Sequence, residues 1–327
     1  MLNIAIIGAG LSGLTAANIL REHANVTVFD KAKGPSGRLA TRRADPYGFD
    51  HGCQFFSAKS SAFQDFLAPM LRDGVLKCWN ATFVEIENRQ ITKSRQWDAQ
   101  KPHYVGSPSM NAVGKYLSQG LNIVLGTAVT TVGKTPTGWL LRDDIGQELG
   151  QFDWVISAIP AQQAAKIWPG DTSFYGKIKT AKMEGCFTLM LGFEAGISLD
   201  YQAALVRDED ISWISVNSSK PDRNAAASLL VHSTNSWATQ HDNMDRNDAL
   251  QYLLEQVSLV IGQDLSHADH KAIHQWRYAN CKKRSGATHF IDHDSRSGAC
   301  GDWLIRGRAE AAFTSGFSIA QDILSRL

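Results

Sequence analysis

A glycine-rich turn between an apolar strand and a helix constrains the fold of this chain more than any other feature. The chain starts with the apolar run MLNIAIIG, which predicts a fully buried strand ending at Gly8. The turn Gly8–Gly13 reads GAGLSG, and a helical stretch follows over residues 14–22. A second strand over residues 25–29 ends at Asp30. This order of strand, turn, helix and strand predicts a dinucleotide-binding fold.

Each glycine of the turn has its own task in such a fold. Gly8 permits the tight turn, Gly10 lets a pyrophosphate approach the backbone, and Gly13 lets the helix lie close to the strand. The N–H groups at the start of the helix, around Ser12, carry a partial positive charge and bind the phosphates. Asp30 stands at the usual spacing for an acid that accepts hydrogen bonds from a ribose diol.

A second glycine–arginine segment, KAKGPSGRLATRR, follows directly from Lys31 to Arg43. A fold that binds only NAD has no need of it, whereas FAD proteins of the amine-oxidase type often carry one along the pyrophosphate and ribityl chain. Arg38 would give charge-assisted contacts to phosphate. The alternative is a basic surface loop, above all for Arg42 and Arg43.

Length and charge exclude several classes of protein. With 327 residues, of which 43% are hydrophobic, the chain predicts one large domain or two joined ones. A net charge of +1 gives no field that favours nucleic acid or an anionic membrane. The five cysteines include no C-x-x-C pair, and no apolar run is long enough for a membrane span. We therefore expect a reduced, soluble, cytoplasmic protein, whose oligomeric state the sequence does not determine.

Further elements predict how the nucleotide-binding domain is completed. Residues 154–159 form an apolar strand stopped by Pro160, and residues 161–167 could start a helix. Residues 122–132 resemble two paired short strands, and residues 309–327 have a helical apolar pattern. The expected FAD-binding domain comprises residues 1–75, 105–165 and 276–327.

The remaining segments predict a second domain built from two insertions, residues 76–104 and 166–275. Three β-like runs occur in the second insertion, over residues 187–191, 211–216 and 228–232. An amphipathic helix is predicted over residues 248–261. The expected fold class is therefore α/β: a Rossmann-type domain with a parallel sheet, and a smaller α+β substrate domain.

With these residues described, the chain resembles the flavin amine-oxidase superfamily, and within it the renalases of the bacterial type. The most specific part is the run from Phe49 to Phe56, FDHGCQFF, beside the GRLATRR loop. Further support comes from Ser157–Pro160, Trp276–Ala279 and the pair Gly301–Asp302. In this family the FDHGCQFF run resembles the wall of the flavin and substrate cavity, which implies FAD as the cofactor.

The resemblance extends to a second FAD motif near the C-terminus. There an acid, here Asp302, binds the ribityl hydroxyls, and a helix N-terminus points at the flavin. The chain departs from the commoner form in having Ala311 where glycine usually stands. The implied cofactor-binding residues are Gly8, Gly10, Ser12, Gly13, Asp30, Lys31, Gly37, Arg38, Leu39, Gln54, Phe55, Val129, Asp302, Arg308 and Ala309.

The resemblance also implies that FAD is held without a covalent bond. Some amine oxidases attach FAD through a cysteine in a Cys-Tyr context that follows a tryptophan. Here Trp276 precedes Cys281, but the context is Asn280-Cys281-Lys282-Lys283. Renalases hold FAD non-covalently, and we expect the same for this chain.

The implied reaction is hydride transfer from the 1,2- and 1,6-dihydro isomers of NAD(P)H onto FAD, giving NAD(P)⁺ and, with O2, H2O2. Hydride loss from a dihydronicotinamide yields an aromatic cation directly, so no acid–base residue is required. This fits a sequence without a Ser/His/Asp set or a paired-carboxylate signature. Two alternatives remain: an amine oxidase or desaturase of the same superfamily, and a non-catalytic dinucleotide sensor.

Candidate substrate residues follow from position and type. Aromatic side chains could stack on nicotinamide or adenine, and Arg277 could meet a phosphate. The candidates are Gln54, Ser57, Trp97, Tyr104, Thr188, His232, Trp276 and Arg277, with Phe55 and Trp213 near them. For the tryptophans a place in the core is the competing interpretation. The pairs His267/His270 and His289/His293 lack matching metal ligands, so we expect no metal site.

Overall fold

The computed structural model describes residues 1–326, which form two compact units. Unit 1 comprises Met1–Leu39, Val113–Met183 and the chain from Asn280. Unit 2 comprises Ala40–Ala112 and Glu184–Ala279. The chain therefore leaves and re-enters each unit, as expected for a domain built from insertions.

Unit 1 is built on a six-stranded sheet that confirms the predicted Rossmann-type fold. Its strands are parallel except for the pair β19–β20. β1 lies between β13 and β2, so that Ile6 stands beside Ile156 and Val28. The strand order is β19 (His289–Asp292), β20 (Ser297–Cys300), β13 (Trp154–Ser157), β1 (Asn3–Ile7), β2 (Asn25–Asp30) and β9 (Asn122–Leu125).

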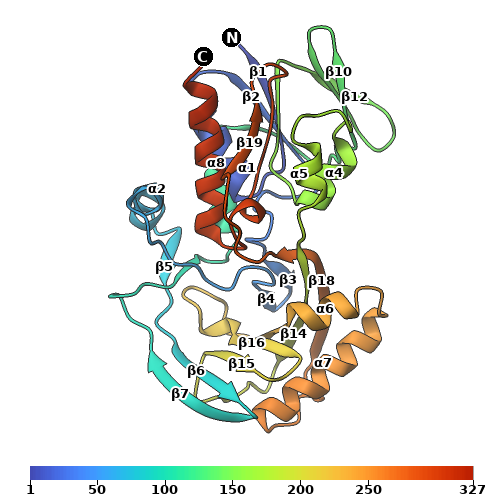
Figure 1. Cartoon of the computed structure of the whole chain (residues 1–327). Coiled ribbons are helices and arrows are strands. Elements are labelled where there is room, and N and C mark those ends of the chain that lie inside the picture. Colours follow the sequence, from blue (N-terminus) through green and yellow to red (C-terminus); the bar gives the residue numbers. More distant parts are fainter. Residues whose placement is uncertain (327) are drawn as a thin grey trace. The chain divides into compact units, whose positions relative to one another are not determined.

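Two helices pack against each other beside this sheet. Figure 1 shows α8 (Ala309–Leu324) running alongside α1 (Leu11–Leu20). The Ser12 hydroxyl donates to the carbonyl of Ala312 at 2.7 Å, which joins the first turns of the two helices. The predicted C-terminal helix is thus confirmed up to Leu324, and Leu327 lies outside the described residues.

A separate layer covers a second set of side chains of this sheet. Among them, Ala5, Ile7 and Val155 lie in a buried core. Three antiparallel strands and two helices supply the rest of this core. They are β10 (Thr131–Thr135), β11 (Gly138–Arg142), β12 (Glu148–Phe152), α4 (Ala161–Ile167) and α5 (Tyr175–Lys179). The predicted strand over 154–159 and helix over 161–167 are thus found as β13 and α4.

The prediction of two paired strands over residues 122–132 is wrong. β9 pairs in parallel with β2, whereas β10 pairs with β11 in the three-stranded sheet. The cause lies in the turn between them, where Gly126 donates to the carbonyl of Ala32 and Thr127 to that of Asp30. These bonds tie the end of β9 to the end of β2, so the chain leaves the sheet before β10 begins.

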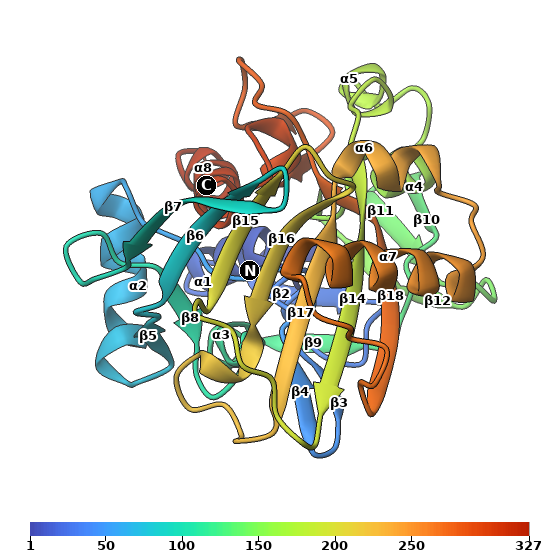
Figure 2. The same ribbon diagram turned by 90° about the horizontal axis from the view of Figure 1, so that it is seen from below.

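Unit 2 contains a seven-stranded sheet, seen in Figure 2 with α7 lying across it. In this sheet β15 and β6 run parallel, whereas the pairs β14–β17, β17–β16, β16–β15 and β6–β7 are antiparallel. The strand order is β18 (His270–Asn280), β14 (Glu184–Phe193), β17 (Ala227–Ser233), β16 (Ile211–Val216), β15 (Ala203–Arg207), β6 (Thr82–Glu87) and β7 (Gln90–Gln96). The three β-like runs predicted for the second insertion are β14, β16 and β17.

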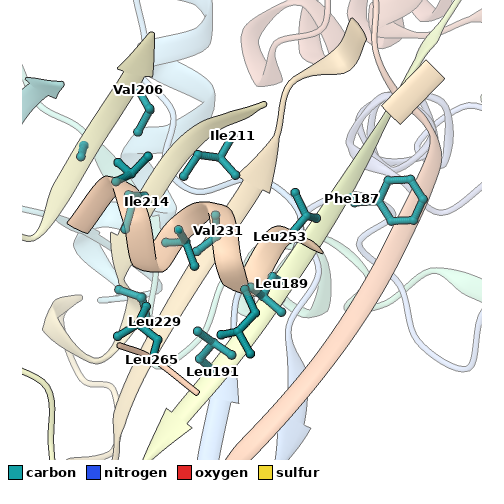
Figure 3. Close-up of a cluster of buried hydrophobic side chains, with 14 of the residues drawn as sticks. Phe187, Leu189, Leu191, Val206, Ile211, Ile214, Leu229, Val231, Leu253 and Leu265 are labelled. Atoms are coloured by element: carbon teal, nitrogen blue, oxygen red, sulfur yellow. The ribbon is translucent and has the colours of Figure 1, made fainter. Parts of the chain in front are cut away.

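The two faces of this sheet differ because side chains alternate along each strand. Figure 3 shows Leu189, Leu191 and Val231 directed toward Leu253 on α7 (Arg246–Ile261). A shorter helix, α6 (Asn235–Gln240), packs on β14 as well. The intervening residues, such as Thr188 of β14 and its partner His232 of β17, belong to the opposite face.

That opposite face receives a hairpin, β3 (Arg42–Ala44) and β4 (Tyr47–Phe49). Tyr47 and Phe49 form a small buried cluster with Met190 and Leu230 of the sheet. The remaining elements are α2 (Ser61–Arg72), β5 (Leu76–Cys78), β8 (Tyr104–Gly106), α3 (Ala112–Leu117) and the 3₁₀ turns η1 (Asn217–Ser219) and η2 (Asp302–Leu304). Because the hairpin packs on the sheet of unit 2, the residues that follow Phe49 begin next to this face.

The compact units differ in extent from the domains expected from sequence. Residues 40–75, 105–112 and 276–279 belong to unit 2, although the sequence boundaries grouped them with the nucleotide-binding segments. Residues 166–183 belong instead to unit 1. The reasons are the packing of Tyr47 on Met190 in unit 2, and of Trp168 and Ile178 in the core of unit 1.

Among residues 1–326, no helix has the length and apolar character needed to cross a membrane.

Gly192 tests the packing of the hairpin on the sheet. A Cβ added there would lie 2.6 Å from the Tyr47 ring, so we expect Gly192→Ala to lower the free energy of unfolding by about 1–3 kcal/mol. Chemical denaturation measures this. Gly176→Ala, in helix α5 with no atom within 4 Å, is the control and should be neutral or slightly stabilising. Equal stability of the two variants would contradict the packing described.

Candidate functional site

The candidate functional residues form two groups, one in each unit. The first surrounds the glycine turn of unit 1. The second lies on the face of the unit 2 sheet that carries the hairpin.

The glycine turn in unit 1 has the backbone contacts that the sequence predicts. Gly8 has φ of +112°, a conformation that favours glycine, and donates to the carbonyl of Phe29 at 2.7 Å. A Cβ on Gly13 would lie 1.9 Å from the carbonyl oxygen of Gly8, so only glycine lets α1 pack this closely. α1 begins after Gly10 without a side-chain cap. Its N–H groups are therefore not taken up by a capping side chain, which fits phosphate binding.

The second glycine–arginine segment lies directly on this turn. Ser36 donates its N–H to the carbonyl of Ala9 at 2.9 Å, and a Cβ on Gly37 would lie 3.0 Å from the Cα of Gly10. Leu39 is buried at the end of the segment. The two glycine segments thus form one backbone cradle that a larger residue at position 37 would disturb.

Asp30 has a structural task in addition to its predicted ribose contact. Its carboxylate accepts the N–H of Ala9 at 2.7 Å through one oxygen and that of Ala32 at 2.8 Å through the other. The acid therefore fixes the glycine turn to the end of β2. Each carboxylate oxygen has further acceptor capacity for a ribose hydroxyl. Lys31 is exposed beside it.

The two FAD motifs expected from the resemblance meet in an ion pair. Arg38 of the second glycine segment lies 2.5 Å from Asp302, whose side chain is 6% exposed. Asp302 precedes α8, whose first residue is Ala309 and whose N-cap, Arg308, makes no side-chain cap bond. Two helix N-termini without side-chain caps, two acids and an arginine are groups that suit the phosphates and hydroxyls of FAD. Val129, by contrast, lies in the core of unit 1.

In unit 2 the turn that follows the hairpin organises several of the predicted substrate residues. The carbonyl of His51 accepts the Thr188 hydroxyl at 3.0 Å and the Trp276 indole N–H at 2.8 Å. The His51 ring also stacks on Trp276, with ring centroids 5.1 Å apart. His274 packs edge-on against both rings. Thr188 and Trp276 are therefore held together by one backbone carbonyl.

The histidines of this face are neutral near pH 7. Burial lowers the pKa of His51 to about 4, of His274 to about 4 and of His232 to about 3. Nearby positive charges, including Arg42, act in the same direction on His51 and His274. These imidazoles can accept or donate hydrogen bonds but carry no charge.

Gln54 was predicted to contact cofactor or substrate, but its amide is engaged within the protein. The amide nitrogen donates to the carbonyls of Asp50 at 2.5 Å and Gly52 at 3.1 Å. Its oxygen accepts from the Ser215 hydroxyl at 2.8 Å and the Lys220 ammonium at 3.2 Å. Gln54 therefore stabilises the turn through hydrogen bonds. Its amide nitrogen also lies 3.5 Å from Nε2 of His232.

A buried charge cluster beside Gln54 was missed by the sequence analysis. The carboxylate of Asp50 accepts from Arg223 at 2.6 Å, Lys220 at 3.3 Å, the Thr41 hydroxyl at 2.7 Å and the Met110 N–H at 3.0 Å. Burial opposes ionisation of Asp50, but Lys220 and Arg223 outweigh it and hold its pKa at about 2. Burial lowers the pKa of Lys220 to about 8, despite the attraction of Asp50.

The sequence offered a partial signal for this cluster. Asp50 and His51 stand inside the FDHGCQFF run, next to Gln54, which was singled out. Lys220 and Arg223 lie in a polar loop, SSKPDRN, where charged residues are ordinarily solvated. Only the tertiary structure shows that the side chains of Lys220 and Arg223 are no more than 4% exposed.

Other predicted substrate residues lie elsewhere in unit 2. Trp97 stacks on His103 with centroids 3.7 Å apart, in an aromatic cluster that includes Phe55 and Trp213. Trp97 is buried, so its packing matches the core interpretation. Three further residues are not brought to the His51 turn by any contact described: Tyr104 is bridged to Phe56, Ser57 is exposed, and exposed Arg277 lies 3.8 Å from Asp242.

The paired histidines of unit 1 have a structural explanation. His289 and His293 both bond the carboxylate of Asp322 on α8, at 3.0 and 2.9 Å. Over residues 1–326 no group of three or more histidine, cysteine or acidic side chains is arranged to hold a metal ion.

Comparison with known proteins identifies the family. Residues 6–69 match the pattern of an NAD(P)-binding Rossmann-like domain. Residues 80–324 match that of the flavin-containing amine oxidoreductases, which covers well over half of the chain. The chain belongs to the flavin-containing amine oxidoreductases. It is an FAD-dependent oxidoreductase, which favours catalysis over the alternative of a dinucleotide sensor.

Relatives of this oxidoreductase support the same fold. It is 22% identical over 303 residues to the renalase of Mus musculus, which spans 85% of each chain. A solved structure described as a protoporphyrinogen oxidase, from Exiguobacterium sp. 255-15, matches with a TM-score of 0.78 and 12% identity over 100% of this chain and 99% of that one. Wild-type putrescine oxidase bound to putrescine matches with a TM-score of 0.69 and 13% identity over 99% of both chains.

Gly13→Ala tests the cradle of this amine oxidoreductase. Because the added Cβ would lie 1.9 Å from the Gly8 carbonyl, α1 must move away from the turn, and we expect the purified protein to lose most of its FAD. The ratio of flavin to protein absorbance measures this. Gly34→Ala, in the adjoining loop with no atom within 4 Å, is the control and should retain its flavin. Full flavin content in Gly13→Ala would refute the assigned cradle.

Asp50→Asn tests the buried charge cluster. Removing the carboxylate leaves Lys220 and Arg223 without a counter-charge, so we expect a loss of about 3–5 kcal/mol in the free energy of unfolding at pH 7. The native pKa of about 2 lies below the ordinary value, so the stabilisation by Asp50 is complete above about pH 4 and is lost as the pH falls toward 2. Denaturant titrations between pH 7 and 2 measure both effects. An unchanged free energy at pH 7 would contradict the cluster.

Proposed function

We propose that this protein is a renalase-type flavoprotein oxidase. It takes a hydride from the 1,2- and 1,6-dihydro isomers of NAD(P)H, producing NAD(P)⁺ and, with O2 as the final acceptor, H2O2. Bound FAD supplies the hydride acceptor and passes the electrons to O2. The proposal rests on the charge of the polar face in unit 2.

That face carries positive charge in excess, and this is the observation that supports the proposal. Lys220 and Arg223 contribute two buried positive charges against the single negative charge of Asp50. The neighbouring histidines are neutral, so they do not offset the excess. An ammonium substrate is disfavoured beside such a cluster, whereas a dinucleotide, with its anionic pyrophosphate, is favoured.

The residues of this cluster also suit a hydride donor from which no proton has to be removed. Asp50, the carboxylate in this group, is ion-paired with two cations and held at a pKa of about 2, which makes it a poor base. Oxidation of a dihydronicotinamide to the aromatic cation requires only hydride loss. The unit therefore has the task of binding and orienting the donor rather than of exchanging protons with it.

A relative with the name renalase adds support to the proposed family type. The protein of Mus musculus that matches 85% of this chain is named renalase. The FDHGCQFF run, residues 49–56, independently resembles the renalases. The relation, at 22% identity, supports the proposal. Within the renalases, the motifs of this chain resemble those of the bacterial type. The proposal also includes a cytoplasmic location.

We further propose that FAD is held non-covalently. Cys281 is buried in unit 1, where its sulfur donates to the carbonyl of Asp302 at 3.8 Å. A buried structural cysteine is also poorly accessible and therefore poorly reactive. Precipitation with trichloroacetic acid should leave the yellow colour in the supernatant; colour in the pellet would overturn this proposal.

Anaerobic reduction of the purified flavoprotein tests the proposed reaction. We expect the 1,2- and 1,6-dihydro isomers to bleach the flavin within seconds, whereas benzylamine and putrescine leave the flavin oxidised over minutes. A stopped-flow spectrophotometer measures both, and ordinary NADPH is the matched control for the isomers. Bleaching by an amine with none by the dihydro isomers would establish an amine oxidase instead. Peroxide yield on re-admission of air completes the measurement.

A further inference from the structure

Unit 2 contains one more buried cation than its buried carboxylate requires. Arg223 lies 2.6 Å from Asp50, closer than Lys220 at 3.3 Å, and could neutralise the carboxylate alone. Lys220 is nevertheless completely enclosed, with 0% of its side chain exposed. Enclosing a second cation costs desolvation energy that a neutral side chain would avoid. Balancing the charge of Asp50 therefore does not by itself explain why an ammonium occupies this position.

The contacts of Lys220 indicate what it does instead. Its ammonium donates to the amide oxygen of Gln54 at 3.2 Å and to that of Asn217 at 3.0 Å, and lies above the ring of Trp79. The Ser215 hydroxyl also bonds the Gln54 oxygen at 2.8 Å, but a hydroxyl can donate or accept, whereas the ammonium can only donate and therefore fixes which end of the amide points toward the lysine. The amide nitrogen must then point back into the turn, where it donates to the carbonyls of Asp50 and Gly52.

The turn fixed in this way carries the one carbonyl shared by two predicted substrate residues. His51 stands between the two residues that Gln54 binds, and its carbonyl accepts both the Thr188 hydroxyl and the Trp276 indole N–H. A rotation of this peptide would release both bonds together. The arrangement thus forms a chain of direct hydrogen bonds from Lys220 through Gln54 and the turn to Thr188 and Trp276.

We propose that Lys220 is a positioning residue: it orients the Gln54 amide, which holds the His51 carbonyl where it sets the places of Thr188 and Trp276. Lys220 contacts neither of these two residues itself and acts through the turn. The proposal deepens the proposed function, because it concerns the face assigned there to the hydride donor. The part that concerns the hydrogen bonds from Lys220 to the turn does not depend on which substrate binds.

Lys220 also gives the arrangement a pH range. Below a pH of about 8 the ammonium is charged and donates to Gln54 and Asn217; above it the amine is neutral and binds more weakly. The charged or titratable groups around it are Asp50 and Cys53 from the turn, Arg223 from the loop after η1, and His232 from β17. Asp50 stays ionised across this range, so donor binding should weaken as the pH rises above 8 and Lys220 loses its charge.

Lys220→Met is the deciding variant. It leaves the Arg223–Asp50 pair balanced, so the protein should fold and retain its FAD. We expect the indole N–H resonance of Trp276, assigned with Trp276→Phe, to shift and to exchange faster with water. The apparent Kd of the dihydro isomers should rise about ten- to a hundredfold, with little change in the limiting rate of flavin reduction. Lys220→Arg, which keeps the charge, should recover most of this affinity, and its binding should no longer weaken near pH 8.

Lys93→Met, an exposed lysine of β7, is the matched control and should behave as the wild type in both measurements. An unshifted Trp276 resonance together with wild-type affinity in Lys220→Met would overturn the proposal. If Lys220→Met fails to fold, Lys220→Gln, which keeps a hydrogen-bond donor without the charge, is judged by the same two outcomes. If the wild type does not react with the dihydro isomers, the proposed function fails, and the Trp276 resonance alone then decides the role of Lys220.

Discussion

The architecture of unit 1 depends on one close backbone contact, the approach of Gly13 in α1 to the carbonyl of Gly8. Because no side chain separates helix from strand there, α1 lies low enough for the second glycine segment to rest on the turn. The same placement lets Ser12 reach α8. The ion pair between Arg38 and Asp302 then joins segments from opposite ends of the chain. A dinucleotide cradle here is a consequence of backbone packing, to which a few charged side chains are added.

The sheet of unit 2 differs between its two faces: one is apolar, and the other carries both polar and apolar side chains. Side-chain alternation directs the apolar residues to one face, where α7 and the shorter α6 cover them. The other face holds buried polar groups, and a charge cluster, an amide and a shared carbonyl provide hydrogen-bond partners for many of them. The candidate site residues of unit 2 thus lie on one side of the sheet, and the large apolar core lies on the other.

The sequence was most informative where local chemistry decides the structure. The turn at Gly8–Gly13, the strand ended by Pro160 and the amphipathic helix α7 all follow from short-range patterns, and the structure contains each of them. The pairing of residues 122–132 was mispredicted because hydrogen bonds to β2 decide it. Lys220 and Arg223 were missed for a related reason: their burial depends on Asp50, far away in sequence. A charged loop residue gives no local sign that a distant carboxylate encloses it.

The interleaving of the two units has a consequence for how the protein is made. β15 pairs with β6 across more than a hundred residues, and Asp302 and α8 complete the cradle only at the end of the chain. A ribosome therefore releases the glycine turn long before the groups that complete the cofactor site exist. The whole of unit 2 must be synthesised in between. Unit 1 therefore cannot complete its cofactor cradle until Asp302 and α8 have been synthesised, after all of unit 2.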